Sequence, residues 1–226
     1  MHRLNVGWHP SAVSTETESL QTGQQQAPQA WYQRSVPLGV LLIVTGAIGL
    51  LSAFELSVDK IRLLRDENAV LSCDLNPFFS CSSVMTYPQS EIFGFPNQFL
   101  GIGAFAVPIM LGALLVAGVE LPRWFMTGLN IGLLGGVVMV TYLQYASLFE
   151  IGAGCPWCMV VWVVTILQFC VVTARSARAG AFGAVLRDSL VARVLSGMPL
   201  AIAGLWLFIV AAVVLVQFWT FFSAQL

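Results

Sequence analysis

Five long apolar stretches constrain this chain more than any other feature of its sequence. They cover residues 37–57, 98–119, 124–149, 156–174 and 197–222, are 19 to 26 residues long, and contain no lysine or arginine. A helix of that length crosses the roughly 30 Å hydrocarbon layer of a membrane. Charged residues make up only 9% of the chain, against about a quarter in soluble domains. The sequence therefore predicts an all-α integral membrane protein with five transmembrane helices.

The remaining residues predict the domain limits and the orientation. Residues 1–36 are polar and rich in Ser, Thr and Gln, so we expect a disordered cytoplasmic tail before a membrane domain at 37–222 and a short tail at 223–226. Basic residues favour the cytoplasmic side of a membrane. An N-in, C-out arrangement places seven of them inside and three outside. The inner set is Arg3, Arg34, Arg123, Arg175, Arg178, Arg187 and Arg193, and the outer set is Lys60, Arg62 and Arg65.

Charge and histidine content exclude several functions. The net charge is −1, whereas a nucleic-acid partner would require a basic face. Both histidines, His2 and His9, belong to the N-terminal tail. Histidine therefore cannot serve as a base or metal ligand in the membrane body.

The connections between spans differ in length. Tight loops at 120–123 and 150–155 predict that helices two, three and four are consecutive antiparallel neighbours. The basic link at 175–196 is interpreted as an interfacial helix. The 58–97 link is long and contains Cys73 and Cys81. We interpret it as an extracytoplasmic lid that lies on the helix bundle, because its second half is unusually apolar for a loop.

Two smaller features lead to local expectations. Asp59 is expected to cap a short amphipathic helix over 59–71. Gly128, Gly132 and Gly136 recur every four residues, and we expect them to pack closely against a neighbouring helix. The alternative for these glycines is close approach to a flat ligand. Cys170 is expected to be a small core residue.

Cys155-Pro156-Trp157-Cys158 opens the fourth predicted helix. Proline suits the first helical position, and the i, i+3 spacing places both sulfurs on one face. The positive end of the helix dipole favours a thiolate there. In the predicted topology this motif lies on the same side as the lid, where an oxidising compartment permits disulfides.

Structural alternatives exist for both cysteine pairs. Cys73 and Cys81 are as consistent with an inert disulfide as with a redox pair. A bridge across CxxC closes so small a ring that it adds little stability, which favours redox chemistry there. Structural zinc prefers C-x2–4-C knuckles, often with histidine, whereas seven residues separate Cys73 from Cys81. We predict no metal.

Two cysteine pairs on one face predict a thiol–disulfide relay. The electrons need a two-electron acceptor that resides in lipid, and a quinone meets both requirements. This step rests on elimination, because no ligand set for haem, flavin or iron–sulfur clusters is apparent in the sequence.

The ordered motifs resemble the vitamin K epoxide reductase family, specifically its bacterial quinone-reducing members. The match consists of Cys73-Asp-Leu-Asn-Pro-Phe-Phe-Ser-Cys81-Ser82, Phe95-Pro96-Asn97-Gln-Phe-Leu-Gly101 and Cys155-Pro-Trp-Cys158, and the resemblance covers roughly residues 37 to 222. It implies that four helices surround a quinone, either menaquinone or ubiquinone, with the fifth helix alongside. It also implies a multi-pass protein of a bacterial cell membrane, with its active site at the extracytoplasmic face.

The resemblance further implies roles for individual residues. Cys73 and Cys81 would take electrons from a partner thiol protein, and Cys81 would attack Cys155, freeing Cys158 beside the quinone ring. Asn97 would hydrogen-bond a quinone carbonyl, although it could equally cap the second helix. Trp162 stands where relatives often have a tyrosine that contacts the quinone.

The implied partner is an extracytoplasmic, DsbA-like thioredoxin-fold protein. Many bacterial relatives carry a fused thioredoxin-like domain after the fifth helix, and this sequence stops at Leu226, so we expect the partner to be separate. The expected function is disulfide-bond formation. A DsbB-type oxidase would have its CxxC before the second cysteine pair, the reverse of the order here. A transporter or channel with purely structural disulfides is the alternative from another class, and it would need a polar pathway through the membrane.

Overall fold

The computed structural model describes residues 30–76, 78–179, 197–219 and 223. The chain divides into one unit at Met1–Trp31 and another at Tyr32–Leu226, and the helices that span the membrane all belong to the second. Most of the predicted N-terminal tail, the predicted interfacial helix beyond residue 179 and nearly all of the C-terminal tail lie outside the described residues.

Within the described residues, five helices are long and apolar enough to cross a membrane, as predicted. They are α2 (Ser35–Arg65), α4 (Asn97–Val116), α5 (Arg123–Tyr145), α6 (Pro156–Arg178) and α9 (Pro199–Gln217). A π-helical segment, Ala146–Ile151, continues α5. The shorter elements are the 3-10 helices Trp31–Gln33 and Pro88–Glu91 and the helix α3 (Cys81–Met85), and the described residues contain no strand.

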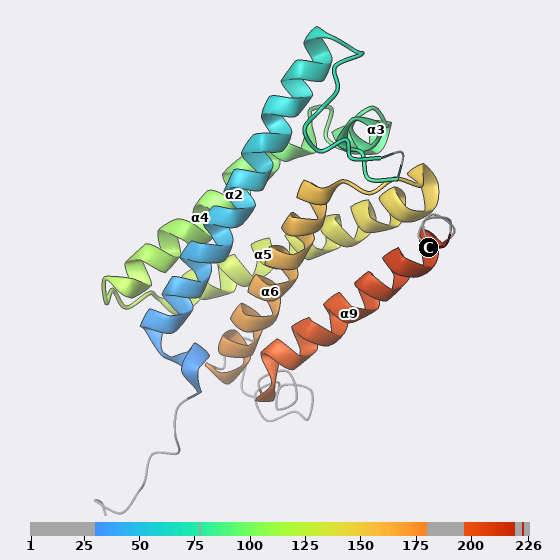
Figure 1. Ribbon diagram of the computed structural model, residues 1–226. Coiled ribbons are helices and arrows are strands. Elements are labelled where there is room, and N and C mark those ends of the chain that lie inside the picture. Colours follow the sequence, from blue (N-terminus) through green and yellow to red (C-terminus); the bar gives the residue numbers. More distant parts are fainter. Residues whose placement is uncertain (1–29, 77, 180–196, 220–222, 224–226) are drawn as a thin grey trace, which may run out of the picture. The chain divides into compact units, whose positions relative to one another are not determined.

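Helix α2 pairs closely with α4, and α6 packs between this pair and α9 (Figure 1). Small residues allow the α2–α4 approach: a Cβ atom added at Gly39 would lie 2.6 Å from the carbonyl oxygen of Gly112. Helices α4 and α5 leave their short connection in diverging directions (Figure 1). Their divergence opens space inside the bundle next to α6.

Helix α2 is longer than the apolar stretch that predicted it. The expected break before Asp59, with Asp59 as the cap of a second helix, is wrong, because α2 continues without interruption to Arg65. Leu56 and Leu63 are both buried, so the same face remains apolar beyond the membrane stretch. The 66–96 segment, which we call the cysteine loop, connects α2 to α4.

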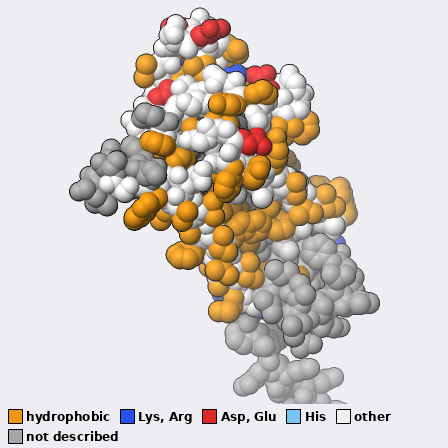
Figure 2. All heavy atoms as spheres, turned by 90° about the vertical axis from the view of Figure 1, so that its right-hand side faces the viewer, with side chains coloured by type: hydrophobic (Ala, Val, Ile, Leu, Met, Phe, Trp, Pro, Cys, Tyr) orange, Lys and Arg blue, Asp and Glu red, His pale blue; other side chains and the backbone are white. Residues whose placement is uncertain are grey.

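The fifth helix flanks the bundle, as predicted. Cys170 and Ile166 of α6 form a buried cluster with Ala203 of α9, which agrees with the expected core role of Cys170. One face of the molecule has a broad cover of hydrophobic side chains, and acidic side chains gather near one end (Figure 2). That distribution suits a bundle surrounded by lipid with one polar end.

Candidate active site

The cysteine loop folds around a disulfide between Cys73 and Cys81. Ser80 caps α3 by accepting a hydrogen bond from the amide of Ser83 (3.1 Å), which fixes Cys81 as the first residue of that helix. The disulfide is enclosed by apolar side chains from α2 and the loop, with Leu56, Leu63, Leu71 and Met85 among them. Cys73 is 5% exposed and Cys81 is fully buried.

Asp74 connects the two ends of this disulfide segment. Its carboxylate accepts hydrogen bonds from the amide of Leu71 (3.0 Å), the amide of Ser82 (3.0 Å) and the hydroxyl of Ser80 (2.8 Å). Burial opposes ionisation of Asp74, but these hydrogen bonds outweigh it and hold the pKa of the carboxyl below its ordinary value. The charged side chain of Asp74 therefore holds the two ends of this loop segment together.

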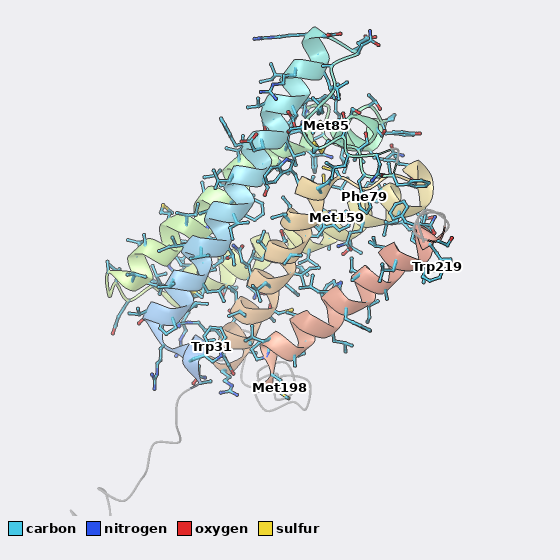
Figure 3. The ribbon with its side chains drawn as sticks, in the orientation of Figure 1. Trp31, Phe79, Met85, Met159, Met198 and Trp219 are labelled. Atoms are coloured by element: carbon cyan, nitrogen blue, oxygen red, sulfur yellow. A yellow bond between two sulfur atoms is a disulfide. The ribbon has the colours of Figure 1, made fainter. Side chains whose placement is uncertain are left out.

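A short backbone bridge places the loop against the start of α6. The amide of Ser80 donates to the carbonyl of Gly154 (3.0 Å), and the amide of Gly154 donates to the carbonyl of Phe78 (2.7 Å). Phe79 of the loop and Met159 in the first turn of α6 lie near each other at this bridge (Figure 3). Because the bridged residues directly precede Cys81 and Cys155, the bridge sets the two sulfurs 3.2 Å apart.

Cys155 and Cys158 are free thiols at the beginning of α6. Cys155 is the N-cap, its sulfur accepts a hydrogen bond from the amide of Cys158 (3.4 Å), and Pro156 occupies the first helical position. Cys155 is fully buried, whereas Cys158 is half-buried.

Cys158 and Trp162 face a cavity of about 780 Å³ between α4, α5 and α6. This size lies within the range of sites for small organic molecules, and most of the wall is hydrophobic. Representative lining residues are Phe93, Phe105, Leu111, Leu129, Leu133 and Met139.

The glycines of α5 line this cavity, contrary to the packing that we expected. A Cβ atom added at Gly128 or Gly132 would meet no protein atom within 4 Å, and one added at Gly136 would only touch Thr165 at 3.4 Å. The regular spacing does mark one face of α5, but a cavity lies opposite that face and not a neighbouring helix. The stripe borders open space, which agrees with the alternative of a flat ligand.

The cavity has a few polar groups near its cysteine end. Asn97 begins α4, but its side chain binds the cysteine loop: Nδ2 donates to the carbonyl of Gln89 (2.8 Å), and Oδ1 accepts from the amide of Ile92 (3.1 Å). One Nδ2 hydrogen is left for a ligand. Pro96, not Asn97, is the N-cap of α4.

Gln98 was missed by sequence reasoning. It also lines the cavity, and its buried Nε2 has no acceptor among the described residues. An amide donor at an apolar cavity wall suits a ligand carbonyl. The only signal in the sequence was its position next to Asn97.

Lys60 fixes the cysteine loop to α2. Its buried Nζ donates to the carbonyl of Met85 (2.8 Å) and forms an ion pair with Glu91 (3.0 Å). The loop is thus attached to three helices, through Lys60 on α2, Asn97 on α4 and the Gly154 bridge before α6.

The described residues contain no group of three or more His, Cys, Asp or Glu side chains that could hold a metal ion. All six residues proposed from sequence, namely Cys73, Cys81, Cys155, Cys158, Asn97 and Trp162, are found around the disulfide or on the cavity wall. A model of the Vitamin K epoxide reductase family matches residues 40–173, more than half of the chain. No curated protein matches the chain.

Proposed function

The chain belongs to the vitamin K epoxide reductase family, and from this membership and the site we infer a specific activity. The family identifies a multi-pass membrane oxidoreductase that acts on disulfides and quinone. We propose that this member reoxidises a DsbA-like, thioredoxin-fold partner and passes the electrons through Cys73/Cys81 and Cys155/Cys158 to a membrane quinone. The outcome is net disulfide formation in the partner.

One observation carries the proposal: the sulfurs of Cys81 and Cys155 lie 3.2 Å apart. Thiol–disulfide exchange requires a thiolate to reach a disulfide sulfur directly, and reacting atoms at about 3–3.5 Å are at the distance of attack. Both sulfurs are fully buried, so a thiol from solvent would not come between these two atoms. An inert disulfide would have no reason to hold a second cysteine pair at this distance.

The cavity fits the head group of a quinone. A flat, apolar ring with two carbonyls matches the open glycine stripe, the hydrophobic wall and the amide donors of Gln98 and Asn97. A bound quinone would take up two electrons and two protons. Trp162 would form part of the apolar wall, and Cys158 is the cysteine that borders the cavity.

The exchange steps follow from the positions of the sulfurs. A partner thiolate opens the Cys73–Cys81 bond, and Cys81 is released as a thiolate. It attacks Cys155 in the oxidised CxxC pair, so that the Cys81–Cys155 bond forms and Cys158 leaves as the thiolate at the cavity. The second thiol of the partner resolves the mixed disulfide with Cys73, so that the partner's own disulfide forms and Cys73 is released. Cys73 then attacks Cys81, restores the first disulfide and releases Cys155. Cys155 and Cys158 remain as dithiol, ready to be oxidised by quinone.

The orientation belongs to the same proposal. Seven of ten basic residues fall on the side of the N-terminus in an N-in arrangement, which supports an extracytoplasmic cysteine loop. We propose a bacterial cell membrane as the location. The transport alternative would need a polar pathway through the membrane, whereas the wall of the cavity is mostly hydrophobic.

The test is quinone reduction by the full chain in lipid nanodiscs, driven by a reduced dithiol and followed by absorbance. Wild type should consume quinone, and Cys158→Ala should not. Cys170→Ala is the matched control, since Cys170 is a buried cysteine remote from the exchange steps, and it should remain active. If folded wild type reduces neither menaquinone nor ubiquinone analogues, the proposal is wrong.

A further inference from the structure

Asp59 is a buried carboxylate at the disulfide for which the exchange steps above have no role. It is 1% exposed and lies within α2. Its Oδ2 is 3.5 Å from the sulfur of Cys73. Its Oδ1 accepts from the guanidinium of Arg62 at 3.2 Å. One oxygen is thus anchored, and the other faces a sulfur that reacts in the relay.

The surroundings of Asp59 argue against a purely structural role. Leu56, Leu63 and Leu71 enclose the disulfide, and burying a carboxylate among such side chains is costly unless it is fully paired. The side chain of Arg62 is 59% exposed, so that ion pair is weakened by solvent. In the disulfide, the sulfur of Cys73 has no hydrogen to donate to Oδ2. When Cys73 is reduced, the same distance suits an S–H···O hydrogen bond.

We propose that Asp59 is the proton acceptor and donor for Cys73, an inference that rests on the relay proposed above. When Cys81 and Cys155 are joined, Cys73 attacks Cys81 and its proton moves to Oδ2 of Asp59. The Cys73–Cys81 bond forms, the Cys81–Cys155 bond breaks, and Cys155 leaves as a thiolate. One disulfide replaces another, so no further oxidant is needed.

The proton is returned in the following cycle. The partner thiolate attacks Cys73, and Cys81 is released. When the second partner thiol resolves that mixed disulfide, Cys73 leaves as a thiolate and takes the proton back from Asp59. The carboxyl group therefore ends each cycle in the state in which it began.

The size of the effect follows from thiol ionisation. A thiol with an ordinary pKa of about 8.5 is only about 3% ionised at pH 7. A base in contact with Cys73 can therefore speed its attack up to about thirty-fold at that pH. The rate advantage that the base gives to Cys73 should vanish as the pH approaches the pKa of the thiol. The other charged groups around Asp59 are Glu55 and Arg62 on α2 and Asp74 of the cysteine loop, so the control has to leave all three in place.

The experiment follows the Cys81–Cys155 disulfide in the full chain in nanodiscs with quinone. A pulse of dithiothreitol starts turnover, and acid stops it. Free thiols are then alkylated, and mass spectrometry measures the fraction of the Cys81 and Cys155 peptides that are joined by a disulfide. Cys73→Ala, which cannot resolve the linkage, provides the reference for complete accumulation. The variants compared are Asp59→Asn and Asp66→Asn, the same substitution at an exposed aspartate that follows the end of α2.

At pH 7, Asp59→Asn should accumulate the Cys81–Cys155 disulfide and resolve it up to about thirty-fold more slowly than Asp66→Asn does. The two resolution rates should become equal near pH 9. Equal slowing at both pH values, or no accumulation, would overturn the inference. Wild type supplies a test that needs no folded variant. Its resolution rate should change little from pH 7 to 8.5, and a nearly tenfold rise per pH unit over that range would also refute Asp59 as the base. Either negative result leaves wild-type quinone reduction, and with it the proposed function, intact.

Discussion

Replacing Gly132 by leucine should block the proposed quinone site without harming the fold. Gly132 lies in α5 on the cavity wall, and an added Cβ atom meets no protein atom within 4 Å. Leucine is the better helix former by roughly 0.5–1 kcal/mol, so stability should be kept. The leucine side chain would occupy space that the ring needs, and overfilling a site costs about 1–3 kcal/mol. We expect the KM for quinone to rise about five- to hundredfold.

Two other glycines make this prediction specific. Gly204→Leu on the exposed face of α9 also meets open space and should leave both the KM and the thermal midpoint unchanged. Gly112→Ala would bring a Cβ atom within 2.6 Å of the carbonyl oxygen of Gly39. That backbone cannot yield without separating α2 from α4, so this variant should melt at a lower temperature.

The assay combines thermal unfolding in nanodiscs with quinone titration at saturating dithiol. If Gly132→Leu melts normally and has an unchanged KM for quinone, the cavity is not the quinone site. If instead it melts at a clearly lower temperature, as Gly112→Ala should, the α5 glycines pack against protein after all, and the geometric reasoning fails.

Three further predictions concern the cysteine loop. Because the pKa of Asp74 is lower in the folded state, its contribution to stability is complete above its unfolded pKa of about 3.9 and is lost as the pH falls through the folded value. In a series of thermal melts at decreasing pH, the melting temperature of Asp74→Asn should therefore fall less steeply at acid pH than that of wild type. Lys60→Met removes a buried donor from the carbonyl of Met85, at a cost of about 1–3 kcal/mol, and should speed hydrogen exchange over residues 81–91. Phe218 is 1% exposed, and its ring centroid lies 5.8 Å from that of Phe78 and 5.7 Å from that of Phe79. Phe218→Ala should lower the free energy of unfolding by about 3–5 kcal/mol. An unchanged thermal midpoint would contradict that packing.

The spans were predictable because apolar length is a property of the sequence alone, whereas helix ends and helix faces depend on tertiary contacts. Residues 58–65 are charged enough to end a membrane stretch, yet α2 continues because Leu63 is buried on the face that Leu56 begins. The charge pattern therefore predicts a helix cap at Asp59, although this residue lies within α2. The spacing of the α5 glycines could not show whether a helix or a cavity lies opposite. A cavity lies opposite these glycines because α4 and α5 diverge, and this divergence is a property of the tertiary structure.

The cysteines could be identified from their order, and the family resemblance implies their sequence of reaction; the geometry adds a physical reason for the proposed sequence. Cys81 is enclosed, with Cys155 at 3.2 Å on one side and the disulfide bond to Cys73 on the other. A partner thiolate has no direct approach to Cys81, whereas Cys73 is the member of the pair with some exposure, 5%. Attack at Cys73 releases Cys81, which is the sulfur already facing Cys155. Entry at Cys81 would instead release Cys73, which has Asp59 as its near neighbour and no second disulfide to attack. In the proposed relay, burial therefore favours entry of the electrons at Cys73, and the same burial would require the cysteine loop to shift outward when a partner binds.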